Sequence, residues 1–87
     1  MSQLDIKVLK KKKLDKELNL KVTKNDATER IFVEFSSKDG KLVVQRSFQD
    51  TYYGRLEAEK FEESMKTIED FQLYLVNKGN RSKNDAN

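Results

Sequence analysis

The sequence predicts a small α+β domain in which a C-terminal helix packs on one face of a four-stranded antiparallel meander sheet. Three observations predict this class: the N-terminal half alternates apolar with polar residues, turn residues separate these runs, and the C-terminal half carries an amphipathic stripe. With 87 residues, the chain is long enough for one hydrophobic core only. The domain is expected to span residues 1–78, followed by a disordered polar tail of residues 79–87.

Four segments have the residue pattern of strands with one buried face. Three of them alternate apolar with polar residues, and the fourth is rich in β-formers with weaker alternation. The segments are residues 4–8, 18–22, 31–35 and 42–48. Their succession predicts a meander in which each strand pairs with the next.

The connection between the third and fourth segments predicts how these two strands pair. Asp39-Gly40 is typical of a two-residue type I′ hairpin, in which both central residues need a positive φ. This turn would place Phe35 opposite Val44, so that the apolar residues of both strands share a face. A slip of one residue would place Glu34 opposite Val44 and mix the faces.

The two earlier connections differ in length. Residues 25–28 are expected to form a four-residue turn that places Leu20 opposite Val33. On the other side of this strand, Ile6 is expected to face Leu20. The connection 9–17 is expected to be a solvated loop, because it contains a run of lysines that cannot be buried. These lysines are Lys10, Lys11, Lys12 and Lys13.

Beyond residue 48 the apolar residues follow the period of a helix. Asp50 or Thr51 can cap its N-terminus, because short polar side chains accept hydrogen bonds from the first free N–H groups. The apolar stripe is expected to cover the sheet, with glutamates on the opposite side of the helix. The stripe consists of Ala58, Phe61, Met65, Ile68, Phe71 and Leu75.

The second part of this helical segment contains signals for a break and for an end. Thr67 and Asp70 resemble a capping box, so the helix is either continuous or broken near Lys66-Thr67. Gly79 is expected to end the helix, since glycine is the commonest residue just beyond a helix C-terminus.

The composition excludes the commonest catalytic and metal-binding chemistries. The chain has no histidine and no cysteine, so it lacks an imidazole base, a thiol nucleophile and the ligands of a zinc finger. Its glutamates are not spaced like a calcium loop, and three glycines are too few for a phosphate-binding loop. We therefore expect a protein that is not an enzyme and that needs no metal or cofactor.

The chain also lacks the sequence features of membrane and secreted proteins. No segment approaches the ~20 apolar residues of a membrane span. The first residues lack the charged and apolar regions of a secretory signal. A cytoplasmic protein without membrane contacts is expected.

The net charge of +3 conceals an uneven distribution of charge along the chain. Residues 1–16 contain six lysines and two aspartates, whereas residues 49–76 contain three basic and seven acidic residues. A polyanion is expected to meet the N-terminal segment first, because the later segment would repel it.

Basic residues and one aromatic residue form the candidate nucleic-acid site. The run from Lys10 to Lys13, together with Lys7 and Lys21, is expected to contact the phosphates of single-stranded DNA or RNA. Phe32 is expected on the uncovered face of the sheet, where it could stack on a base. Plainer interpretations remain open: the lysine run is a solvated loop without a partner, and Phe32 is a dimer contact or is placed on this face by an error in the predicted register.

Two further groups of residues lie near the start of the helix. Tyr52, Tyr53 and Arg55 either pack the end of the sheet or bind a protein partner, since both residue types are enriched at binding hot spots. Arg46 is in line with the apolar residues of its strand. It is expected to pair with a carboxylate such as Glu57 or Asp50, because an unpaired buried guanidinium is costly.

The order of four antiparallel strands and a helix resembles that of coactivator-type and Whirly-type single-stranded DNA-binding proteins. Residues 40–48 are similar to the coactivator-type strand that carries an arginine followed by an aromatic residue. The glycine-containing strand that leads into the helix of that family is absent here. No site residue is therefore assigned from the resemblance.

These observations favour a small, homodimeric, non-catalytic module that binds single-stranded nucleic acid. The alternative is an accessory protein of the phage or mobile-element type, which modulates a host protein through its acidic helix or an exposed strand edge. A purely structural dimerisation domain is a third interpretation.

Overall fold

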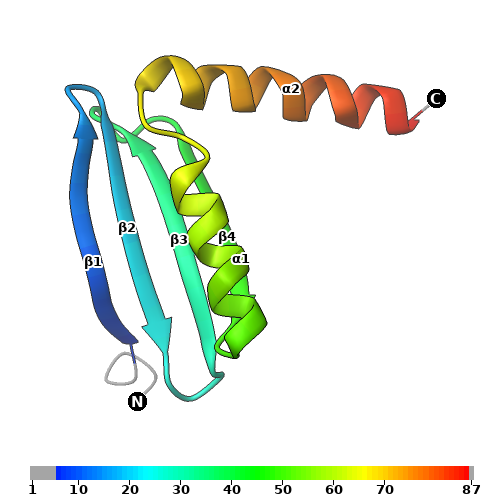
Figure 1. The fold of residues 1–87 in the computed structure, drawn as a ribbon. Coiled ribbons are helices and arrows are strands. Elements are labelled where there is room, and N and C mark those ends of the chain that lie inside the picture. The colour runs from blue at the N-terminus through cyan, green and yellow to red at the C-terminus, as the bar shows by residue number, and fades with distance from the viewer. Residues whose placement is uncertain (1–5, 87) are drawn as a thin grey trace.

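The fold consists of a four-stranded sheet followed by two helices (Figure 1). The computed structural model describes the backbone of residues 6–86 and the side chains of residues 6–78. The elements are β1 (Ile6–Asp15), β2 (Leu18–Asn25), β3 (Arg30–Ser37), β4 (Val43–Gln49), α1 (Tyr52–Glu63) and α2 (Ile68–Ala86). The strands are antiparallel in the order β1-β2-β3-β4, which confirms the α+β class and the meander. Residues 4 and 5, expected in the first strand, lie outside the described residues.

Helix α1 packs on one face of the sheet, over β3 and β4, and the opposite face is open (Figure 1). The core lies between α1 and the sheet, and Phe35, Val33 and Leu18 are fully buried there. Ala58 and Phe61 are the buried residues of α1, and the Phe61 ring meets the Phe35 ring edge to face at 5.2 Å. The expectation that apolar side chains of the sheet lie beneath the helical segment is confirmed for β2, β3 and β4.

The β3–β4 hairpin has the predicted register but a different turn. Phe35 pairs with Val44, as expected. Gly40 has a φ of 76°, but among the described residues Glu29 is the only non-glycine with positive φ, so Asp39 cannot belong to a type I′ turn. Asp39 instead accepts hydrogen bonds from the Ser37 hydroxyl and from the Lys41 N–H. The side chain of Asp39 thus stabilises a longer loop.

The β2–β3 hairpin differs from the predicted register by two residues. Leu20 pairs with Phe35 instead of Val33, because Asn25 stays in the sheet and the turn begins one residue later. The Oδ1 of Asn25 accepts hydrogen bonds from the N–H groups of Ala27 and Thr28. Glu29, the last residue of the turn, has a φ of 54°. A shift of two residues keeps each side chain on its face, so the predicted faces of β2 and β3 remain correct.

The prediction for β1 was wrong. The lysine run is not a loop but part of the strand, and the β1–β2 connection consists of residues 16–17 alone. Two register irregularities interrupt the pairing, at Leu9 and at Leu14. Because each adds one residue to β1, the side chains change faces, and Lys12 instead of Ile6 lies opposite Leu20.

Of the two alternatives left open for the helical segment, the break near Lys66-Thr67 is the one observed, so the single C-terminal helix of the predicted fold is replaced by two helices. Thr51 caps α1 by accepting a hydrogen bond from the Gly54 N–H, and α1 ends at Glu63. The capping box before α2 is formed in both directions: the Thr67 hydroxyl accepts from the Asp70 N–H, and the Asp70 carboxylate accepts from the Thr67 N–H. The C-terminal segment therefore forms two helices rather than one.

Helix α2 leaves the body of the protein at an angle to α1 (Figure 1). Its first turns reach the core through Phe71, which is fully buried, whereas Leu73 and Val76 are exposed. The sequence predicts that the helix ends at Gly79, but α2 continues to Ala86. The division into a domain and a disordered tail stays a prediction. Neither helix, within the described part of the chain, is long and apolar enough to cross a membrane.

Candidate nucleic-acid interface

The open face of the sheet is the candidate interface. The cross-strand register arranges its side chains in four rows that run across the strands. The row of Phe32 also contains Val8, Thr23 and Ser47. Phe32 is half-buried between the buried residues Ile31 and Val33, which confirms its predicted place on this face. Phe32 is flanked by Thr23 and Ser47 across the strands, and its side chain is partly accessible.

The rows on either side of Phe32 carry basic side chains. Lys11 lies opposite Lys21 in one neighbouring row, and Lys13 lies one row further along. Arg30 lies in the row on the other side of Phe32, where its guanidinium donates a hydrogen bond to the Ser47 hydroxyl at 2.9 Å. Arg30 is not among the site residues predicted from the sequence, although its position next to Ile31, which faces the core, indicates that it lies on the open face.

One carboxylate interrupts this basic surface. Glu34 pairs with Lys21 across β2 and β3 and accepts a hydrogen bond from the Gln45 amide at 3.4 Å. Among the described strand residues it is the only acidic side chain on the open face. The described part of the open face therefore carries four cationic side chains and one anionic side chain, so its charge is positive.

The other predicted lysines lie on the helix side of the sheet. Lys10 is opposite Val22, and its ammonium group lies 2.7 Å from the Glu62 carboxylate of α1. Lys7 forms an ion pair with Asp26 at 3.1 Å. Lys12 is on the same side as Lys10, opposite Leu20. The predicted set of phosphate-binding lysines is thus divided between two faces, because the bulge at Leu9 was not visible in the sequence.

The predicted ion pair of Arg46 is absent from the described part of the structure. The Arg46 guanidinium instead lies over two aromatic rings, 5.2 Å from the centroid of Phe48 and 5.1 Å from that of Phe61. This side chain is exposed, so its charge remains in water while its stem covers the edge of the core. The expectation of a buried charge that needs a carboxylate was wrong for this reason.

Asp50 is the centre of a small ion-pair network at the start of α1. Its carboxylate lies 2.7 Å from the Lys24 ammonium group and 3.2 Å from Nε of Arg55. The hydrogen bond from Lys24 is the main cause that lowers the pKa of Asp50, and the same bond raises the pKa of Lys24. Arg55, predicted as a partner-binding residue, is therefore engaged within the chain, although most of its side chain is exposed.

Tyr52 and Tyr53 are the most exposed large hydrophobic residues of α1, with 70% and 77% of their surface accessible. Their rings meet at 5.4 Å in an edge-to-face arrangement. They do not pack the end of the sheet, which removes the plainer of the two interpretations offered for them. Their exposure favours the partner-binding interpretation, which stays a prediction.

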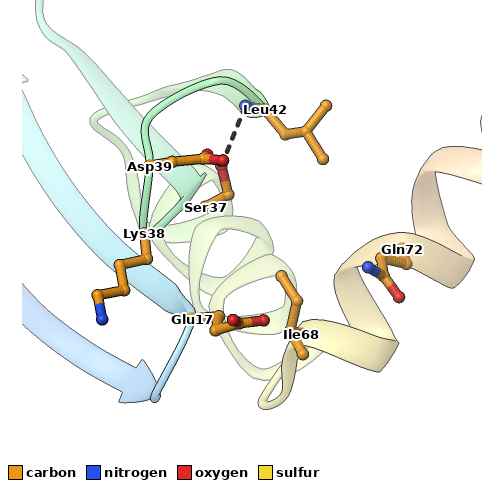
Figure 2. Close-up of a pocket in the computed structure, with 7 residues that line it drawn as sticks. All are labelled: Glu17, Ser37, Lys38, Asp39, Leu42, Ile68 and Gln72. Atoms are coloured by element: carbon orange, nitrogen blue, oxygen red, sulfur yellow. Dashed lines mark hydrogen bonds between the residues drawn. The ribbon is translucent and has the colours of Figure 1, made fainter.

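A pocket lies at the opposite end of the sheet, between the β3–β4 loop and the start of α2 (Figure 2). Two of its polar groups serve the loop itself: the Ser37 hydroxyl donates to Asp39 at 2.6 Å and accepts from the Leu42 N–H at 3.1 Å. Ile68 and Gln72 of α2 form the other wall. Glu17 and Lys38 also line the pocket, and their opposite charges make it a mixed polar site.

The described residues contain no group of carboxylates placed to hold a metal ion. Comparisons with protein families, with curated proteins and with solved structures give no match for this chain.

Proposed function

We propose that the open face of the sheet binds single-stranded DNA or RNA without catalysing a reaction. The observation that carries this proposal is the place of Phe32 in a central strand, with basic side chains in the rows on both sides. Lys11 and Lys21 lie on one side and Arg30 on the other. An aromatic platform between cations is the combination with which sheet proteins hold single strands.

The proposed roles follow from the chemistry of each row. The ring of Phe32 stacks on one base, a contact worth about 1–3 kcal/mol and tolerant of sequence. Adjacent rows lie about 7 Å apart along the strands, so the phosphates on either side of the stacked base reach the cations. Thr23 and Ser47 flank the ring and offer hydroxyl groups to the base or the sugar.

The helix side of the molecule supports the same orientation. The exposed surface of α1 carries glutamates, and the lysines beneath them are drawn into contacts such as that of Lys10 with Glu62. A polyanion is repelled from this side and attracted to the open face. The acidic helix thus orients the protein on the nucleic acid.

The decisive experiment is a titration of isotope-labelled protein with a short single-stranded oligonucleotide, monitored by amide chemical shifts. Shifts are expected in the row of Phe32 and in its two neighbouring rows. Phe32→Ala should weaken binding about tenfold, since it removes the stacking platform. Phe32→Tyr keeps an aromatic ring and should retain most of the affinity.

Two results would overturn the proposal. One is the absence of binding at low salt, where electrostatic attraction to nucleic acid is strongest. The other is a set of shifts confined to α1 and α2. Equal affinities of the Phe32→Ala variant and the unmodified protein would exclude the assigned role of the ring.

The exposed tyrosine pair favours a second candidate function, the binding and modulation of a partner protein as an accessory factor. Tyr52 and Tyr53 present aromatic surface at the end of the molecule where β4 passes into α1. A pull-down that returns a defined protein, insensitive to nuclease and abolished by Tyr52→Ser with Tyr53→Ser, would support this function. A partner lost on nuclease treatment would support the first proposal instead.

A further inference from the structure

Glu34 is the residue of the open face that attraction to phosphates does not explain. It is the one acidic side chain on this face among the described strand residues, and it lies two residues from Phe32 in β3. A carboxylate at this place repels the phosphates of a single strand. Glu34 therefore lowers the affinity for nucleic acid unless it binds another part of the chain.

The carboxylate of Glu34 keeps acceptor positions for a ligand. It takes part in none of the ion pairs formed by the described residues, although Lys21 is its cross-strand neighbour. Its side-chain hydrogen bond is long, at 3.4 Å from Nε2 of Gln45 to Oε1. The residue is half-buried, so part of its surface remains accessible. Since an ionised carboxylate has about four acceptor positions, this bond leaves most of them for a ligand.

The cations of the open face are concentrated on one half of the sheet. Three of the four lie on β1 and β2, namely Lys11, Lys13 and Lys21. The fourth, Arg30, begins β3 and donates a hydrogen bond to the Ser47 hydroxyl. Phe32 and Glu34 lie on β3, beside the polar side chains of β4. A single strand that follows this division has its phosphates over β1 and β2 and its bases over β3 and β4.

A base stacked on Phe32 has one edge near Glu34. The two residues are on the same face of one strand, and their Cα atoms are about 7 Å apart. This distance is close to the length of a purine. A purine that covers the Phe32 ring along the strand direction therefore presents an edge to the carboxylate. Gln45, opposite Glu34 on β4, adds an amide at the same edge.

The donors on this edge determine which base a carboxylate binds. An ionised carboxylate only accepts hydrogen bonds. The Watson–Crick edge of guanine has two adjacent donors, N1–H and the N2 amine, which match the two oxygens of one carboxylate. Adenine and cytosine have one amine beside an acceptor nitrogen, and thymine and uracil have one N–H between two carbonyl oxygens. Because these acceptors repel a carboxylate, guanine is the base that fits Glu34.

We infer that Glu34 makes the open face prefer guanine among the bases of a single strand. This inference rests on the proposed function, because it assigns the specificity of the same surface. Phe32 stacks on the guanine, and Glu34 accepts hydrogen bonds from its N1–H and its N2 amine. Lys11 and Lys21 neutralise the neighbouring phosphates. The carboxylate thus raises the affinity for guanine and lowers it for the other bases.

The first test compares single-stranded DNA probes that differ in one base. The probes are oligothymidylates of about nine nucleotides, in which the central base is thymine, adenine, guanine or hypoxanthine. The guanine probe should bind about tenfold more tightly than the adenine probe, which controls for the stacking of a purine. Hypoxanthine keeps N1–H but lacks the N2 amine, so its probe should lose most of this preference.

The second test removes the carboxylate. Glu34→Gln presents one donor and one acceptor, so it opposes one of the two guanine donors and should lose most of the guanine preference. The same variant should bind the all-thymine probe more tightly, because a negative charge leaves the face. Glu57→Gln is the matched control: it removes the same charge from an exposed position of α1 and should keep the preference. Circular dichroism and thermal unfolding confirm that both variants are folded.

The outcomes distinguish this inference from the proposed function. If no probe binds at low salt, the proposed function fails, and the role of Glu34 fails with it. If the four probes bind with equal affinity, or if Glu34→Gln keeps the guanine preference, only the role of Glu34 is overturned. A hypoxanthine probe that binds as tightly as the guanine probe overturns the two-donor contact.

Discussion

Gly54 and Gly40 occupy their positions for different physical reasons. A Cβ atom at Gly54 would overlap the carbonyl oxygen of Gln49, because the first turn of α1 lies directly against the end of β4. At Gly40 no atom lies within 4 Å of a Cβ, but the φ of 76° is unfavourable for other residues. One glycine is required for close packing and the other for backbone conformation.

Gly54→Ala is therefore expected to destabilise the protein more than Gly40→Ala. The overlap with a backbone atom forces α1 away from the sheet, at a cost of about 3 kcal/mol. The strain at Gly40 costs about 1 kcal/mol. Urea unfolding of both variants measures the difference. A loss at Gly54 no greater than that at Gly40 would show that the helix start can move freely.

At the scale of elements, Asp15 connects the β1–β2 hairpin to the start of α2. Its carboxylate accepts hydrogen bonds from the Ile68 N–H at 3.0 Å and the Lys16 N–H at 2.7 Å. These two bonds lower the pKa of Asp15, with that from Ile68 as the larger cause. The pKa of Asp70 is lowered in the same way, by hydrogen bonds from the N–H groups of Lys66 and Thr67. Two aspartates thus hold the end of the helix that reaches the core.

The stabilisation that Asp15 and Asp70 provide should consequently depend on pH. The unfolded pKa of aspartate is about 3.9, and the folded values are lower. The stabilisation is therefore fully present above about pH 4 and is lost as the pH falls through the folded pKa. Urea unfolding at a series of acidic pH values should show this loss. Asp15→Asn should reduce the dependence of the unfolding free energy on pH, whereas Glu63→Gln at an exposed position of α1 should not. If the unfolding free energies of Asp15→Asn and of the unmodified protein depend on pH in the same way, the role of Asp15 is contradicted.

The elements were predictable where side chains alone determine them. Alternation gave β2, β3 and β4 their faces, and Thr67 with Asp70 marked the break between the helices. In β1 the direction of the side chains depends on the register irregularities at Leu9 and Leu14. No residue pattern marks these irregularities, yet they determine which lysines face the helix side. Lysines on the helix side of β1 are tolerated because β1 is exposed from Ile6 to Lys13. Lys10 also pairs with Glu62 of α1, which is far away in the sequence.

At the scale of the whole molecule, the lysine run contributes to two surfaces of opposite character. Lys11 lies on the open face beside Lys21, and Lys12 lies on the helix side opposite Leu20. The sequence treats these neighbours alike, and a flexible lysine arm would make them equivalent in binding. In the fold they lie on opposite sides of the sheet. The sequence therefore predicts which residue types form the candidate site, but not which of the lysines belong to it.

Neutralising these two neighbouring lysines separates the alternatives. Lys11→Gln should weaken oligonucleotide binding and reduce the slope of log affinity against log salt by roughly 0.7, the value for one phosphate contact on a single strand. Lys12→Gln removes the same charge from the other side and should leave this slope unchanged. Binding measured across a salt series therefore reports which face meets the nucleic acid. Equal salt-dependence slopes for the two variants would mean that the lysine run binds as one flexible arm. The open face would then not be the interface.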